Sequence, residues 1–334
     1  MEKILASAPS RVILTGEHFV VYGAPSLVVP VEVRNAVSIS EGQGELRVEM
    51  ESRLGTASAY ANGSFLGSRI MRPYAQVVTR ACKKAALPRP LIAWFDIKSP
   101  RGMGASTSLA VAFAAALYSA LGIVPGVDEL FQCAQESDRL AHGKAPSGMD
   151  AKAILEGPVK VRKSFAPLRF GFEKKEVELP LGTTLLFIDT ARGEWSTRTT
   201  MYAKFAAAHG INKKPEELTP EEREKIVLPF LSVYDTVVAE LRKDGDAAAL
   251  GDALRDNHEL LRNAGVSTPE IEDAISAARE NGSLGEKMTG KGGVGGSVLI
   301  LVKEENKRKV AEAVQKKGFR VLEAPIGRGG IEVK

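Results

Sequence analysis

Alternating apolar and polar side chains mark the first long element of the chain. Between residues 28 and 40, four valines alternate with polar residues or proline. Successive side chains of a strand point to opposite faces, so this pattern predicts one long β-strand with a buried face. Residues 3–15 predict two short strands separated by Pro9. Residues 45–51 follow a glycine-containing turn and predict a hairpin partner for the long strand.

A second pattern, with apolar residues three or four positions apart, predicts the helices. The predicted helices span residues 69–86, 109–121, 127–141 and 304–317, with a further helical region at 195–281 that a charged connection at 213–225 interrupts. The predicted strands elsewhere lie at residues 91–97, within 157–180, and at 184–188, 284–289, 297–302 and 319–322.

The order of these elements indicates the fold class. Strands precede helices in the first half, and the second half ends in a strand–helix–strand unit, which is an α+β order rather than a regular βαβ alternation. The chain has 334 residues, above the size at which a single core usually divides, so we expect two domains. A boundary near residue 180 gives predicted domains at residues 1–180 and 181–334.

One uncharged segment, residues 102–127, has the length of a membrane span. It is rich in Ala, Ser and Gly rather than Leu and Ile, and a proline lies near its end. A membrane span is therefore the weaker interpretation. We expect a helix that is buried on all sides within the first domain.

Composition narrows the functional classes. The chain is 44% hydrophobic and 26% charged with a net charge of +4, which is typical of a globular protein and too weakly basic to indicate nucleic-acid binding. A mild positive charge suits an anionic substrate. The two cysteines, Cys82 and Cys133, form no CxxC or Cys/His pattern, and the N-terminal apolar run is too short for a signal peptide. We expect no zinc site, no disulfide framework and a cytoplasmic protein.

Residues 99–108 form the first candidate site. A predicted strand leads into a loop of small residues, and a predicted helix follows. This order directs backbone N–H groups and the positive end of the helix dipole toward an anion such as phosphate. The loop has neither the Walker A sequence nor the dinucleotide-binding fingerprint. A plain turn with a capped helix is the alternative interpretation.

Three polar residues, Arg11, Glu17 and His18, lie within and directly after a predicted apolar strand. Each has a structural interpretation: a surface cation, its carboxylate partner and a buried histidine. Their grouping with Gly16 and nearby Gly23 indicates the wall of a site at the end of a strand.

Residues 138–150 carry two candidate carboxylates. Asp138 and His142 are four positions apart and share a helix face, where a carboxylate could hold Mg²⁺. Asp150 follows Ser147-Gly148 at the start of a predicted helix. It is either an acidic residue favoured by the helix dipole or a general base for a substrate hydroxyl.

Residues 290–296 contain five glycines in seven positions, directly before an apolar strand. Glycine is entropically costly to order, which argues against an ordinary connector, and the flanking strands argue against a flexible loop. We expect a loop that packs closely against a ligand or against the glycine loop at residue 102.

These segments, in this order, resemble the GHMP kinase superfamily over nearly the whole chain, and within it the archaeal and bacterial mevalonate kinases. Residues 16–23, GEHFVVYG, are similar to the GEHxVVYG motif of that branch. Residues 138–150 are similar to its ERxxHGxPSGxD run, and residues 257–267 to its helix followed by GVS.

The resemblance implies a two-domain α+β GHMP kinase fold, with an N-terminal ribosomal-S5-like α/β domain and a C-terminal ferredoxin-like α+β domain. It implies ATP- and Mg²⁺-dependent phosphoryl transfer to the 5-hydroxyl of mevalonate, in the mevalonate pathway of isoprenoid biosynthesis. The implied partners are ATP and mevalonate, with no nucleic acid and no membrane. A homodimer is one expectation for the oligomeric state.

By position, the resemblance also assigns roles to residues. The implied catalytic residues are Asp150 and Arg11. The implied substrate-binding residues are His18, Glu17 and Thr197. The implied Mg²⁺ ligands are Ser106 and Asp138. The implied ATP-binding residues are Gly102, Met103, Gly104, Ala105, Ser106, Thr107, Ser108, Gly290, Gly292 and Gly293.

The chain departs from the family pattern at several of these positions. Arg11 stands where these kinases usually carry Lys, although galactokinases carry Arg. The other replacements are Asp138 for Glu, Ala105 for Ser and Trp195 for Arg, with one additional residue between Gly143 and Pro146. Because the loop register is open, Ser108 is an alternative to Ser106 as the hydroxyl that reaches Mg²⁺.

Three other activities stay open at this stage. A related kinase could act on phosphomevalonate or on the 3-hydroxyl of mevalonate. A diphosphomevalonate decarboxylase would release CO₂. A binding protein could keep the fold without catalysis, although Asp150, Asp138 and the cation at position 11 argue against it.

Overall fold

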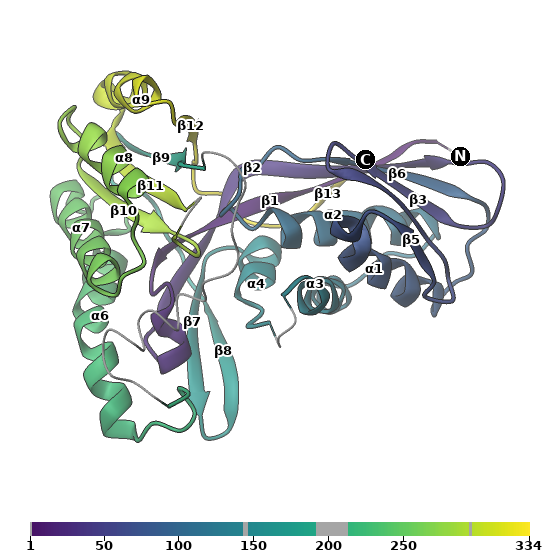
Figure 1. Ribbon diagram of the computed structural model, residues 1–334, viewed down its shortest axis with the longest axis horizontal. Helices are drawn as coiled ribbons and strands as arrows, with labels where there is room; N and C mark the ends of the chain where they lie inside the picture. The colour runs from purple at the N-terminus through teal and green to yellow at the C-terminus, as the bar shows by residue number, and fades with distance from the viewer. Residues whose placement is uncertain (1, 143–145, 192–212, 294–295) are drawn as a thin grey trace.

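Two lobes, joined by a pair of long strands, make up the described chain (Figure 1). The computed structural model describes residues 2–142, 146–191, 213–293 and 296–334. In Figure 1 the first lobe extends to the right as a sheet with helices beneath it, and the second lobe stands at the left. The arrangement agrees with the predicted α+β class.

Within the described residues, the first lobe is built on a nine-stranded sheet. Its main path has the order β13-β1-β2-β6-β3-β4-β5, and the β7–β8 hairpin pairs with β2. The strands are β1 (Ile4–Thr15), β2 (Ser26–Glu41), β3 (Val48–Ser52), β4 (Gly55–Ala59), β5 (Phe65–Gly67), β6 (Leu91–Asp96), β7 (Val159–Phe165), β8 (Leu168–Lys174) and β13 (Glu332–Val333).

Helices cover one face of this sheet (Figure 1). They are the 3₁₀ turn η2 (Arg69–Met71) and the helices α1 (Arg72–Cys82), α2 (Ala105–Ala120), α3 (Val127–His142) and α4 (Met149–Glu156). A further 3₁₀ turn, η1 (Phe19–Tyr22), lies instead against β7 and against helix α6 (Pro220–Glu240) of the second lobe. The central helix α2 packs on β1 and β2 and is buried without interruption over residues 107–118. The expectation of a buried helix in the uncharged segment is therefore confirmed. No helix in the described part of the chain is long and apolar enough to cross a membrane.

Two strand predictions were wrong. Residues 3–15 form the single strand β1, because a register shift between Pro9 and Ser10 accommodates the proline within the ladder. The predicted hairpin at residues 45–51 is absent, since β3 pairs in parallel with β6, which lies between β3 and β2. Strand order in a sheet depends on distant segments, which local alternation does not encode.

The second lobe contains a four-stranded sheet of order β10-β11-β9-β12 within the described residues. Its strands are β9 (Thr183–Asp189), β10 (Gly285–Thr289), β11 (Ser297–Lys303) and β12 (Arg320–Glu323). Its helical elements are α6 (Pro220–Glu240), α7 (Ala247–Asn263), α8 (Pro269–Arg279), η3 (Glu304–Asn306) and α9 (Lys307–Lys316).

The charged connection predicted at residues 213–225 ends earlier than expected. Helix α6 begins at Pro220, and a capping box defines its start: the Glu222 N–H donates to Thr219 Oγ1 at 3.2 Å, and the Thr219 N–H donates to Glu222 Oε2 at 2.7 Å. Two acidic residues of this stretch, Glu221 and Glu222, lie in the first helical turn, where the helix dipole favours them.

The two lobes share a core at their junction. Val12 and Leu14 of β1 pack in one apolar cluster with Leu185 and Phe187 of β9 and with Val233 of α6. The chain also returns to its start, because β13 pairs with β1 (Figure 1). We keep the domain boundary near residue 180 as a proposal, with the last strand added to the first sheet.

Candidate active site

The phosphate-binding loop expected at residues 99–108 has the geometry of an anion site. Gly102 and Gly104 both adopt positive φ, at 89° and 71°, which only glycine adopts readily. Gly104 precedes α2 and gives it no side-chain cap. The first-turn N–H groups of α2 are thus available to an anion, as at other helix N-termini that bind phosphate.

Asn35, a residue that the sequence did not single out, fixes the start of this loop. Its side chain is fully buried on β2. Its Oδ1 accepts hydrogen bonds from the backbone N–H groups of Lys98 and Ser99 at 2.9 and 3.0 Å. Its Nδ2 donates to Ser10 Oγ at 3.3 Å and to Ser108 Oγ at 3.1 Å. One amide therefore joins β1, the loop and α2.

Arg11 and Asp150, the predicted catalytic pair, meet beside the loop although 139 positions separate them. Arg11 Nη2 donates to Asp150 Oδ2 at 2.6 Å, and Arg11 Nη1 donates to the Gly102 carbonyl at 2.6 Å. Both side chains are mostly buried, with 11% and 21% exposure. The fork of the guanidinium is used to hold the carboxylate and the loop at a fixed separation.

Asp138, the predicted metal ligand, lies against the first turn of α2. Thr107 Oγ1 donates to its carboxylate at 2.9 Å, and Ser106 Oγ lies 3.4 Å from Oδ1. Burial, and the neighbouring charge of Asp150, raise the pKa of Asp138 to about 6. Two carboxylates in a poorly solvated site are the surroundings in which a bound cation is favourable.

These residues fit a Mg²⁺ ion that is also bound by ATP phosphates. The described residues contain no cluster of three or more His, Cys, Asp or Glu side chains suited to a metal. Mg²⁺ commonly uses one or two carboxylates together with phosphates and water, so a protein-only cage is unnecessary. The hydroxyl of Ser108 donates to the Ala8 carbonyl at 2.9 Å, which leaves Ser106 as the better candidate.

Glu17 and His18 lie near the site, where the two lobes touch. Glu17 forms a buried ion pair with Lys287 of β10, and Lys287 Nζ also donates to the Ile13 and Met288 carbonyls. His18 adopts φ 61°, an uncommon value for a non-glycine residue. Burial, and then the charge of Lys287, lower the pKa of His18 to about 4, so the ring is neutral at pH 7.

The expected contact between the two glycine loops is present. A Cβ at Gly290 would lie 3.4 Å from the Gly102 carbonyl oxygen, so the loops meet backbone to backbone. Gly293 N–H donates to the Val266 carbonyl at 3.0 Å, and Ser297 Oγ donates to the Arg101 carbonyl at 3.1 Å. The second lobe therefore supports the phosphate-binding loop directly.

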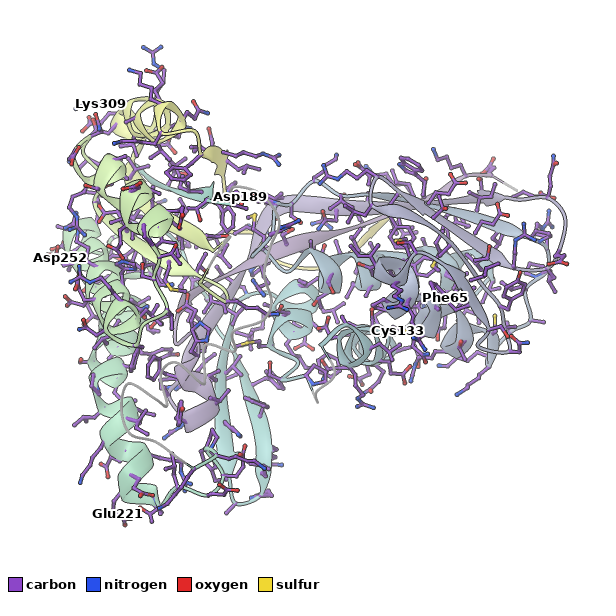
Figure 2. All side chains as sticks on the ribbon, viewed as in Figure 1. Phe65, Cys133, Asp189, Glu221, Asp252 and Lys309 are labelled. Atoms are coloured by element: carbon purple, nitrogen blue, oxygen red, sulfur yellow. The ribbon has the colours of Figure 1, made fainter. Side chains whose placement is uncertain are left out.

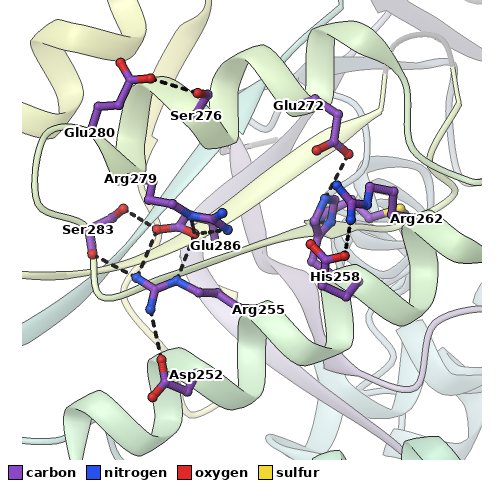
Figure 3. Close-up of polar contacts among 12 residues, drawn as sticks. Asp252, Arg255, His258, Arg262, Glu272, Ser276, Arg279, Glu280, Ser283 and Glu286 are labelled. Carbon is purple, nitrogen blue, oxygen red and sulfur yellow. Dashed lines mark hydrogen bonds and ion pairs between the residues drawn. The ribbon is translucent and has the colours of Figure 1, made fainter.

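Polar contacts behind β10 hold this strand in place (Figure 3). The fully buried carboxylate of Glu286 accepts from Arg255 Nε at 3.2 Å and from Arg279 Nη2 at 3.1 Å. His258 Nδ1 accepts from the Met288 N–H at 3.2 Å, so its Nε2 carries the proton that it shares with Glu272 at 3.0 Å. These contacts join α7 and α8 to the strand that carries Lys287.

Some predicted site positions lie outside the described residues. They are Thr197 and Trp195 of the expected substrate segment, and residues 143–145, which contain the expected one-residue insertion at Lys144 or Ala145. The remaining predicted residues converge on one location at the junction of the lobes.

Comparisons with known proteins agree with this geometry. The family model described as GHMP kinases N terminal domain matches residues 74–157, and the one described as GHMP kinases C terminal matches residues 237–320. The chain is 28% identical to a mevalonate kinase of Aeropyrum pernix over 335 residues, with 98% of each chain covered. It is 29% identical to a mevalonate kinase of Archaeoglobus fulgidus over 326 residues, with 96% of this chain and 100% of that protein covered.

The fold is similar to that of a solved structure as well. The crystal structure of L. major mevalonate kinase in complex with R-mevalonate has a TM-score of 0.73 at 21% identity, with 96% of this chain and 95% of that chain covered. The matched family models, the full-length relatives and the fold agree with one another, and the chain belongs to the GHMP kinases.

Proposed function

We propose that the protein is a mevalonate kinase, which transfers the γ-phosphoryl group of ATP to the 5-hydroxyl of (R)-mevalonate in the cytoplasm. The Arg11–Asp150 pair beside the phosphate-binding loop is the observation that carries this proposal. The proposal is supported because a carboxylate that could act as the general base and a cation lie beside a loop whose backbone N–H groups could receive phosphate. Full-length similarity to relatives named mevalonate kinase supports the choice of acceptor.

The reaction would proceed by in-line displacement. The acceptor oxygen forms a bond to the γ-phosphorus as the bond from phosphorus to the β–γ bridging oxygen breaks, and ADP leaves with that electron pair. Asp150 accepts the hydroxyl proton. Arg11 orients the Asp150 carboxylate, while the α2 N-terminus would stabilise charge on the phosphates.

Asp138 and Ser106, whose side chains lie together, would hold Mg²⁺. When bound, Mg²⁺ neutralises negative charge on the β- and γ-phosphoryl oxygens. Thr107 donates to the Asp138 carboxylate and fixes its orientation. His18 would contact the acceptor in its neutral form. The Glu17 carboxylate is fully buried in its ion pair with Lys287, so it would act by fixing the junction of the lobes rather than by touching the acceptor.

A substrate panel tests this proposal. The purified protein is incubated with ATP and Mg²⁺ and with mevalonate, 5-phosphomevalonate or 5-diphosphomevalonate, and ADP release is followed. We expect ADP release with mevalonate, and ³¹P NMR of the product should locate phosphate on the 5-oxygen. Phosphate on the 3-oxygen, turnover of phosphomevalonate alone, or release of CO₂ would each establish one of the alternative activities.

Asp150→Asn tests the general base within the same assay. We expect kcat to fall by about 10²–10⁴-fold, because the amide cannot accept the proton. Binding of AMP-PNP should remain. Asp244→Asn is the matched control, since it removes the same charge at a side chain with 84% exposure in the loop after α6. Full turnover by Asp150→Asn would refute the proposed role.

A further inference from the structure

Lys291 lies in the loop that follows β10 and reaches the expected phosphate-binding loop. Contacts of the residues before and after it fix its backbone. Immediately before it, Gly290 meets Gly102, and Thr289 Oγ1 donates to the Ile13 carbonyl at 3.1 Å. Two residues after it, the Gly293 N–H donates to the Val266 carbonyl. The backbone of Lys291 is therefore held in place by contacts with both lobes.

The charges around Lys291 belong to the proposed site. Its side chain is exposed overall. Partial burial of the ammonium lowers the pKa of Lys291, and the positive charge of Arg11 lowers it further. The negative charges of Asp150 and Asp138 act in the opposite direction and raise this pKa. The same ammonium also disfavours protonation of His18, which contributes to the lowered pKa of that ring. The Lys291 ammonium therefore interacts electrostatically with three predicted site residues: the base Asp150, the metal ligand Asp138 and the cation Arg11.

Arg11 is poorly arranged to serve the transferred group alone. One Nη atom donates to the Gly102 carbonyl and the other to Asp150, each at 2.6 Å, and its Nε is buried. A guanidinium that turned toward the γ-phosphoryl group would release the base or the loop. A second cation with a flexible stem would let Arg11 keep both contacts.

We propose that Lys291 is a catalytic residue of the phosphoryl transfer, whose ammonium binds the non-bridging oxygens of the γ-phosphoryl group from the second lobe. This inference rests on the proposed kinase function and assigns to Lys291 a role that the sequence patterns did not. The positive charge of the Lys291 ammonium stabilises the negative charge on the phosphoryl oxygens. In the same step Asp150 takes the proton of the acceptor, and ADP leaves with the electron pair of the broken bond.

Nucleotide binding tests the contact independently of the acceptor. Calorimetric titrations with Mg-AMP-PNP and Mg-ADP compare the wild type with K291Q, K291R and K309Q. Lys309 is the matched control because it is exposed on the outer side of α9 (Figure 2). We expect K291Q to weaken AMP-PNP binding by about tenfold and ADP binding by less than about twofold, since ADP lacks the γ-phosphoryl group. K291R should recover most of the AMP-PNP affinity, and K309Q should bind both nucleotides like the wild type.

Turnover supplies the second readout. We expect kcat of K291Q with mevalonate to fall by about 10²-fold, the usual cost of one electrostatic donor in a transition state, with little change in KM for mevalonate. K291Q that binds AMP-PNP and ADP like the wild type and keeps its kcat would overturn the assignment. If the wild type phosphorylates no mevalonate, the proposed acceptor is wrong, whereas the difference between AMP-PNP and ADP still decides the role of Lys291.

Discussion

Replacement of His18 by Asn should reduce the loss of unfolding free energy that the protein undergoes as the pH falls from about 7.5 to about 5. Burial and then Lys287 lower the pKa of His18 from 6.5 to about 4 in the folded protein. An unfolded chain restores the ordinary value, so between these two pH values the unfolded state binds more protons than the folded state. Stability contributed by the neutral ring is present above pH 6.5 and is lost as the pH falls toward 4.

The size of this effect follows from the two pKa values. From near pH 7.5 to near pH 5, the wild type should lose about 2 kcal/mol through His18, and about 3 kcal/mol once the pH falls below 4. His18→Asn has no titrating group and tolerates the positive φ at this position, so it should lose about 2 kcal/mol less over the first interval.

Urea unfolding at a series of pH values, followed by tryptophan fluorescence and circular dichroism, measures the difference. Each variant is compared with its own value near pH 7.5, which removes any constant effect of the substitution. The remaining histidines titrate in both proteins and cancel. Parallel profiles for the wild type and His18→Asn would refute the assignment of a neutral, buried imidazole.

Two further substitutions test the geometry of the site and the packing of the strand behind it. Arg11→Lys should lower kcat by about 10²-fold in the ADP-release assay, because one ammonium cannot reproduce both forked contacts to Gly102 and Asp150; near-normal kcat would show that charge alone is required. Gly251→Ala should destabilise the protein by about 1–3 kcal/mol despite the higher helix propensity of alanine, since its Cβ would lie 2.2 Å from the Leu284 carbonyl oxygen. Gly171→Ala, whose Cβ approaches no heavy atom closer than 3.8 Å, is the control in thermal unfolding, and equal midpoints for the two variants would contradict the packing argument.

The parts of the fold that were predictable have local causes. The buried helix α2 follows from an uninterrupted run of small and apolar residues, and the start of α4 at Met149 follows from Gly148. Strand β2 follows from the period of two in its sequence, although residues 26–31 are buried on both faces, which that alternation does not predict. Each of these signals lies within the element that it predicts, so no knowledge of the remaining chain is required.

The missed features depend on residues far apart in the sequence. Asn35 bonds to positions that lie 25, 64 and 73 residues away, and nothing in its own neighbourhood distinguishes it from a surface amide. Lys287 and Glu17 are 270 residues apart, and both would ordinarily be solvent-exposed. Burial of such a pair is favourable only when the surrounding backbone supplies further hydrogen bonds, as the Ile13 and Met288 carbonyls do for Lys287.

The two hydrogen bonds of Arg11, to Asp150 and to the Gly102 carbonyl, explain why arginine rather than lysine stands at this position. A lysine can offer its single charge to either the base or the phosphoryl group, whereas Arg11 joins the base to the phosphate-binding loop. That arrangement fixes the first lobe but commits the guanidinium to protein partners. The second lobe then has to supply the charge that meets the transferred group, and Lys291 stands on the loop that makes backbone contact with Gly102. The two departures from a simple lysine site are, by this reasoning, parts of one arrangement, in which Arg11 positions the base and Lys291 binds the phosphoryl group.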